Sequence, residues 1–158
     1  MIVFVEPISR NISMHVPTYP LSLMEVASFV QHHLPDVGIK TISMAVDYGL
    51  PLMPEGREQI YSRLLQDLSE MGPRGVGISC TAIVQAEEAL DLCERIKSAN
   101  PCMFVFLGGY FPTLYYEEIL LKTDAVDCIV IGEGEVPACA LIACLEGGED
   151  PRDQNLSN

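Results

Sequence analysis

The chain has 158 residues, of which 49% are hydrophobic and 20% charged. This length suits one domain with a sizeable core, and the composition is that of a globular protein. The 22 acidic residues outnumber the 9 basic ones, which gives a formal net charge of -13. Neither nucleic acid nor an anionic membrane is an expected partner, because so acidic a chain is repelled by phosphate groups.

The apolar runs are about as long as strands, well short of the roughly 20 residues that a membrane span needs. Residues 2–7, IVFVEP, lack the basic region and cleavage site of a secretory signal, so we expect a cytoplasmic protein. Most of the six cysteines lie inside apolar segments, which indicates packing thiols rather than disulfides. Their spacing matches no zinc or iron–sulfur motif, so no protein ligand for a metal is expected.

Apolar patterns predict five strands that alternate with five helices. In chain order, the strands are expected over residues 2–6, 39–46, 75–79, 103–107 and 127–131. The helices are expected over residues 21–34, 60–68, 83–96, 117–121 and 136–145. The strand over 39–46 alternates apolar with more polar residues, which favours a position at the edge of the sheet.

The inner strands are apolar on both faces, which is typical of a parallel sheet with helices on both sides. We therefore expect an α/β fold with a doubly wound, open, five-stranded parallel sheet, Rossmann-like or flavodoxin-like, in the order 2-1-3-4-5. The domain would span residues 1–147. Residues 148–158 lack periodicity and are expected to be a linker or a truncated tail.

Sheets of this kind bind ligands at the carboxyl ends of their strands. The loop after the first strand, PISRNISMHVPTYP, contains no glycine, which disfavours the phosphate-binding turns for NAD, FAD, ATP and FMN. A phosphoacceptor domain is also disfavoured, because the third strand ends in Ser79-Cys80-Thr81 rather than in an aspartate. A thiol enzyme that uses Cys80 is a minor alternative, since Glu87 and Glu88 would raise the pKa of that thiol.

Four segments carry a resemblance to a known family. YPLSLMEVASFVQ, GVGISCTA, FVFLGGYFPT and VDCIVIGEGEVPACALIACLEG occur in this order. They resemble the amino-terminal cobalamin-binding domain of cobalamin-dependent radical S-adenosylmethionine (SAM) enzymes, over about residues 2 to 147. The most specific part is LGGYFPT followed by the GEGE turn. The resemblance implies that the domain holds cobalamin with its nucleotide tail extended beside the sheet.

The resemblance also implies which residues bind the cofactor, and all of them lie where a strand ends or a helix begins. They are Pro20, Leu21, Ser79, Cys80, Thr81, Gly108, Gly109, Tyr110, Gly132, Glu133 and Gly134. The Ser79–Thr81 turn would hydrogen-bond the tail, which would pass along the glycine pair, while Pro20 and Leu21 would begin the helix under the corrin. Taken singly, each glycine has a simpler interpretation as part of a tight turn.

Two departures from related proteins bear on the chemistry. Other cobalamin domains carry D-x-H-x-x-G after the first strand, but here His15 follows Ser13 at two residues, without the aspartate. The resemblance therefore implies no histidine that ligates cobalt. The C-x-x-x-C-x-x-C motif is also missing, so a 4Fe-4S cluster and S-adenosylmethionine would belong to a downstream domain that this chain lacks.

The implied function is a cobalamin carrier that is not catalytic by itself. It would present cobalt to the carboxyl-terminal radical SAM domain of a methyltransferase-like or cyclase-like enzyme, and an exposed interdomain surface could also support a homodimer. The alternative is a domain of the same fold without cobalamin affinity, which would serve protein interaction or small-molecule binding.

Overall fold

The structure is a computed structural model that describes residues 1–9, 17–50 and 54–153. Its centre is a five-stranded sheet in the order β2-β1-β3-β4-β5, with all neighbouring strands parallel. The strands are β1 (Ile2–Glu6), β2 (Ile39–Ser43), β3 (Gly75–Ser79), β4 (Phe104–Gly108) and β5 (Cys128–Val130). The predicted fold class and strand order are confirmed, as is the position of β2 at an edge.

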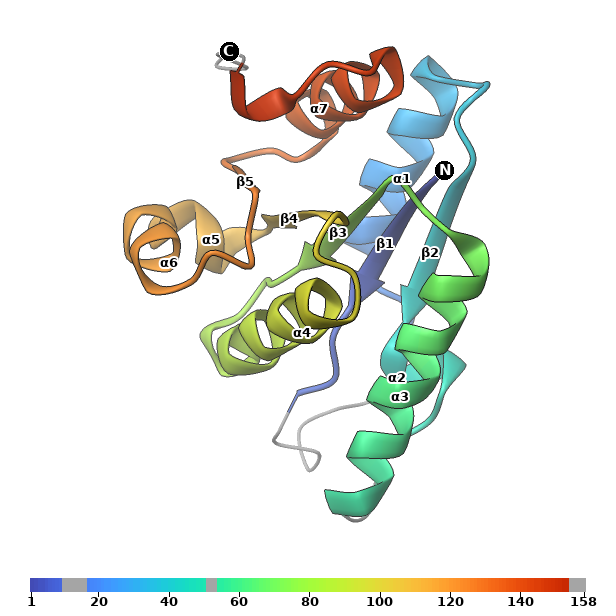
Figure 1. Ribbon diagram of the computed structural model, residues 1–158, viewed down its shortest axis with the longest axis vertical. Coiled ribbons are helices and arrows are strands. Elements are labelled where there is room, and N and C mark those ends of the chain that lie inside the picture. The colour runs from blue at the N-terminus through green and yellow to red at the C-terminus, as the bar shows by residue number, and fades with distance from the viewer. Residues whose placement is uncertain (10–16, 51–53, 154–158) are drawn as a thin grey trace.

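Helices cover both faces of this sheet (Figure 1). They are α1 (Leu21–His33), α2 (Met44–Asp47), α3 (Pro54–Met71), α4 (Ala86–Ala99), α5 (Tyr110–Leu114), α6 (Tyr116–Lys122) and α7 (Glu135–Gly147). Helices α1 and α7 pack on one face and α3 and α4 on the other, while α5 and α6 lie beside β5. Within the described ranges, no helix is long and apolar enough to cross a bilayer.

The strands explain the two cores because successive side chains point to opposite faces. In β1, Ile2 and Phe4 belong to the core under α1 and α7, and Val3 and Val5 belong to the core under α3 and α4. All four side chains are almost completely buried. A strand buried on both faces reads as a continuous apolar run, which is why the sequence identified it.

The prediction of a strand over residues 39–46 was wrong at its carboxyl end. The strand stops at Ser43, whose backbone amide donates a hydrogen bond to the Asp47 carboxylate at 2.8 Å, and Met44–Asp47 form the short helix α2. Met44 and Ala45 are both buried. The contact between Ser43 and Asp47, four residues apart, closes the turn that takes the chain out of the sheet.

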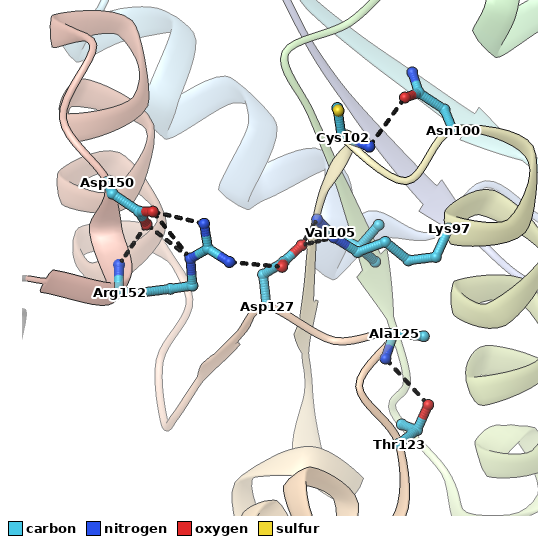
Figure 2. A network of polar contacts seen from close by, with 9 residues as sticks. All are labelled: Lys97, Asn100, Cys102, Val105, Thr123, Ala125, Asp127, Asp150 and Arg152. Atoms are coloured by element: carbon cyan, nitrogen blue, oxygen red, sulfur yellow. Dashed lines mark hydrogen bonds and ion pairs between the residues drawn. The ribbon is translucent and has the colours of Figure 1, made fainter.

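A polar network lies at the start of β5, at the end of the sheet where the strands begin (Figure 2). The Asp127 carboxylate pairs with Lys97 of α4 at 2.5 Å and with Arg152 at 3.6 Å, and it accepts a hydrogen bond from the Val105 amide at 2.7 Å. Asp127 in turn donates its own amide to the Val105 carbonyl at 2.8 Å. One carboxylate therefore joins β4, α4 and the segment that follows α7.

That segment includes a short 3-10 helix, Pro151–Asp153, inside the predicted linker. Pro151 is buried, and Arg152 also pairs with Asp150 at 2.6 Å. Pro151 and Arg152 therefore contact the rest of the domain, and the boundary at residue 147 stays a prediction.

Candidate functional site

A cavity of about 380 Å³ lies between the sheet and helices α1 and α7, toward the carboxyl ends of the strands. Its floor includes Phe4, Phe106 and Val130, which belong to the core on that face. Eight of the predicted cofactor-binding residues are among those that line it: Ser79, Thr81, Gly108, Gly109, Tyr110, Gly132, Glu133 and Gly134. The strand-end rule for α/β sheets thus identified the correct edge of the molecule for a cavity.

The register of the sheet brings Ser79, Gly108 and Val130 into one row. Ser79 pairs with Gly108, and Gly108 pairs with Val130, across three adjacent parallel strands. All three residues line the cavity. The row therefore offers a hydroxyl, a position without a side chain and a small apolar side chain to whatever lies over it.

Gly108 and Gly109, at the end of β4, lack a side chain for different structural reasons. A Cβ on Gly109 would lie 2.5 Å from the Cys80 carbonyl oxygen, and its φ of +111° is one that other residues rarely adopt. Gly109 is therefore needed by the backbone itself. A Cβ on Gly108 would meet only the Val130 Cβ, at 3.6 Å, which is an ordinary contact. The missing side chain of Gly108 instead leaves space in the cavity.

Farther down the same face, Gly77 allows the aromatic floor of the cavity to form. A Cβ at Gly77 would lie 2.5 Å from the Phe106 ring and 2.9 Å from the Phe4 ring. These two rings meet edge to face, with centroids 5.8 Å apart. The sequence analysis did not single out Gly77, although its alternation with Ser79 along β3 is the signal that would have found it.

Thr113 connects the two glycine turns that border the cavity. Its hydroxyl donates a hydrogen bond to the Gly109 carbonyl at 2.8 Å and accepts one from the Gly132 amide at 3.1 Å. Thr113 lies in α5 and Gly132 follows β5, so the hydroxyl holds two separate rim segments together. No pattern in the sequence predicts this role.

The hydroxyls of the Ser79–Thr81 turn have different surroundings. The Thr81 hydroxyl and amide both donate to the Gln85 side-chain oxygen, at 3.1 and 3.3 Å. Ser79 is half-buried, and its hydroxyl has no hydrogen-bond partner among the residues that the structure describes. Ser79 is therefore the better donor to a ligand, while Thr81 helps to hold the turn.

Cys80 does not face the cavity, although the resemblance implies a place for it in the site. The residue is fully buried and its thiol donates to the Ala82 carbonyl at 3.5 Å. Burial raises the pKa of the Cys80 thiol to about 12, although the hydrogen bond to Ala82 by itself would lower that pKa. The thiol stays protonated at neutral pH, so the geometry does not support a nucleophilic cysteine.

Helix α1 contributes to the cavity one residue later than the resemblance implies. Pro20 lies directly before α1 and Leu21 is 73% exposed, and the cavity is lined instead by Ser22, Glu25 and Val26. His15 lies outside the described residues. Among the described residues, no cluster of His, Cys, Asp or Glu side chains is suited to hold a metal ion.

Comparison with known proteins gives a family for the chain. A family model described as the B12 binding domain matches residues 15–142. Two curated relatives are named anaerobic magnesium-protoporphyrin IX monomethyl ester cyclase. The protein from Synechocystis sp. is 44% identical over 55 residues, or 35% of this chain and 11% of the relative. The protein from Rubrivivax gelatinosus is 33% identical over 85 residues, which cover 51% of this chain and 15% of the relative.

The chain thus spans only a small part of the length of these relatives. Among solved structures, the RcsB response regulator of Salmonella typhimurium superposes with a TM-score of 0.59 at 12% identity. The match covers 95% of this chain and 61% of that protein. At this identity the likeness concerns the fold alone.

Proposed function

Because the chain belongs to the family of B12-binding domains, we propose that it binds cobalamin, with the nucleotide tail of the cofactor in the cavity between the sheet, α1 and α7. The observation that carries this proposal is the row of Ser79, Gly108 and Val130 on the cavity wall. It combines a hydroxyl with no partner among the described residues, an open backbone position and an apolar surface. A flat, partly polar group that lies against the sheet needs these features.

The volume of the cavity suggests that only part of the cofactor lies inside it. A volume of about 380 Å³ is near the lower end of the range for small-molecule sites, roughly 300–1,000 Å³, so it suits a portion of cobalamin rather than the whole. The corrin ring would lie at the mouth, where Tyr110 is 69% exposed. Bound cobalamin supplies a redox-active cobalt, and the residues of this chain hold and orient it.

The enzyme to which this domain belongs is part of the proposal. The resemblance implies that the domain presents cobalt to a radical SAM domain outside this chain, which would hold a 4Fe-4S cluster and S-adenosylmethionine. The names of the two curated relatives favour a cyclase over a methyltransferase as that enzyme. The substrate contacts would lie mostly in the catalytic domain.

Incubation with hydroxocobalamin, followed by desalting and visible spectroscopy, tests the proposal. We expect about one corrinoid to be retained per chain, with the spectrum of cobalamin whose tail base has left the cobalt. Cobinamide, which has the corrin but no nucleotide tail, should be retained much less. A chain that retains no corrinoid would be the alternative domain without cobalamin affinity, and retention with the tail base on cobalt would contradict a tail in the cavity.

A further inference from the structure

Burial divides the cavity wall into an apolar inner part and a more polar mouth. Every polar side chain that lines the cavity is exposed or half-buried. The buried side chains that line it are all apolar, and they include Phe4, Leu23, Phe106, Val130 and Ala138. A group that enters the cavity therefore leaves the polar side chains behind as it reaches the inner part.

The register of the sheet places Phe4, Gly77 and Phe106 in a second row on the cavity wall. Phe4 pairs with Gly77, and Gly77 pairs with Phe106. This aromatic row lies two residues nearer the start of the strands than Ser79 and Gly108, on the same face of the sheet. A Cβ on Gly77 would lie 2.5 Å from the Phe106 ring and 2.9 Å from the Phe4 ring, so the two rings meet over β3.

The surroundings of the aromatic row offer little hydrogen bonding to a ligand. Strands β1, β3 and β4 each have a neighbour on both sides, so their peptide groups pair across the sheet. The helices contribute Leu23, Val26 and Ala138 to the wall and to the core on this face. Among the residues that the structure describes, the inner part thus has no polar side chain that could replace the water around a ligand.

We propose that the inner part of the cavity selects cobamides, the corrinoids with a nucleotide tail, whose base is a benzimidazole over those whose base is a purine. This inference rests on the proposed function. The base is the last group along the tail, so a tail that enters from the mouth brings it to the aromatic row. A purine there loses the hydrogen bonds that its ring nitrogens and amino group make to water, and a buried polar group without a partner is disfavoured. The hydrocarbon ring of a benzimidazole packs on the aromatic row without that loss.

The test compares three cobamides by spectral titration of the unmodified chain: hydroxocobalamin, benzimidazolylcobamide and adeninylcobamide. Benzimidazole and adenine are bicyclic rings of nearly equal size, so these two cobamides differ mainly in the polarity of the base. The base must leave cobalt before it enters the cavity, so each affinity is corrected for the base-off fraction of the free cobamide, measured by acid titration. We expect the adenine form to bind at least about tenfold more weakly than the benzimidazole form.

The outcomes of this comparison separate the inference from the proposed function. Equal corrected affinities of the adenine and benzimidazole forms would overturn the inference and leave cobalamin binding intact. An equal loss for both forms relative to hydroxocobalamin would also overturn it, because recognition would then depend on the two methyl groups of the natural base and not on polarity. Failure of hydroxocobalamin itself to bind would instead reject the proposed function.

The variant Ala138→Ser tests whether the inner part is responsible. It adds a hydroxyl that can donate and accept hydrogen bonds, so the ratio of affinities between the benzimidazole and adenine forms should fall to about threefold or less. Ala89→Ser is the matched control, because Ala89 is equally buried but belongs to the core on the other face of the sheet. That variant should keep the ratio of the unmodified chain, and thermal unfolding checks that both variants fold. An unchanged ratio in Ala138→Ser, or an equal fall in Ala89→Ser, would refute the role of the inner part.

Discussion

Gly108 and Gly109 are adjacent, but a side chain at each should have a different effect. Gly109→Ala places a Cβ 2.5 Å from the Cys80 carbonyl oxygen at a φ of +111°, so we expect the free energy of unfolding to fall by about 2 kcal/mol or more. Gly108→Val projects into the cavity, so we expect the variant to fold and to bind hydroxocobalamin at least about tenfold more weakly. Thermal unfolding and spectral titration of the two variants check this, and tight binding by Gly108→Val would count against the cavity as the site.

Thr113 should matter through its hydroxyl rather than its shape. Thr113→Val keeps the volume but loses the hydrogen bonds to Gly109 and Gly132, so the two rim segments would no longer be joined. We expect a loss of about 1–2 kcal/mol in stability and a several-fold loss of cobalamin affinity. Thr113→Ser keeps the hydroxyl and serves as the matched control. If both variants bind cobalamin like the unmodified chain, the bridge has no part in shaping the site.

The buried Cys80 thiol predicts a loss of stability at alkaline pH. Burial raises the pKa of this thiol from 9.0 to about 12, so above pH 9 the unfolded chain releases a proton that the folded chain keeps. The stability that the protonated Cys80 thiol gives the folded chain is fully present below pH 9 and is lost as the pH rises toward 12. For this one group, the free energy of unfolding falls by no more than about 1.4 kcal/mol per pH unit. Urea unfolding between pH 8 and about 10.5 should show a shallower decline in Cys80→Ala. An unchanged slope would mean that other groups cause the decline.

At the scale of single elements, the Asp127 network should stabilise the fold without affecting the ligand. Asp127→Asn keeps an acceptor for the Val105 amide but loses the ion pairs, and we expect a cost of about 1–2 kcal/mol, mostly from the half-buried Lys97 partner. Arg152→Gln is the control with a small expected effect, because that side chain is 58% exposed. Cobalamin affinity should be unchanged, since the network lies at the opposite end of the strands from the cavity. Weaker binding by Asp127→Asn would contradict that separation.

The elements show which parts of the fold the sequence predicted and where it failed. The inner strands were predictable because both faces are buried, so a run such as IVFVE has one interpretation. The error at Met44–Asp47 arose because Ile42, Met44 and Val46 also fit an alternating strand. What ends the strand is a contact between Ser43 and the Asp47 side chain, which periodicity does not reveal.

The site was predictable to the extent that it depends on strand ends. Ser79, Gly108 and Gly132 come to one cavity because parallel strands end at one edge, and that follows from the fold class. The contributions of Ser22 and Glu25 depend on how α1 turns toward the sheet. Those are packing outcomes that a linear pattern leaves open.

At the scale of the whole molecule, cobalamin should raise the stability of the domain. A ligand that binds only the folded chain adds about 2.7 kcal/mol at a concentration 100 times its Kd, which would raise the Tm by about 5–10 °C for a domain of this size. Differential scanning fluorimetry with and without hydroxocobalamin measures this shift, and Gly108→Val should show little of it. A stabilisation that is equal in Gly108→Val would indicate binding away from the cavity.

The two open edges of the sheet bear on how the chain avoids joining its own copies into larger sheets. An exposed strand edge is a template for pairing with another strand, and proteins counter this with short edges, covering elements and lysine. At one edge, β5 has only three residues, with α5 and α6 beside it. At the other, Lys40 is exposed on β2 and the turn of α2 ends the strand after five residues. Growth of the sheet from chain to chain is thus opposed at both sides.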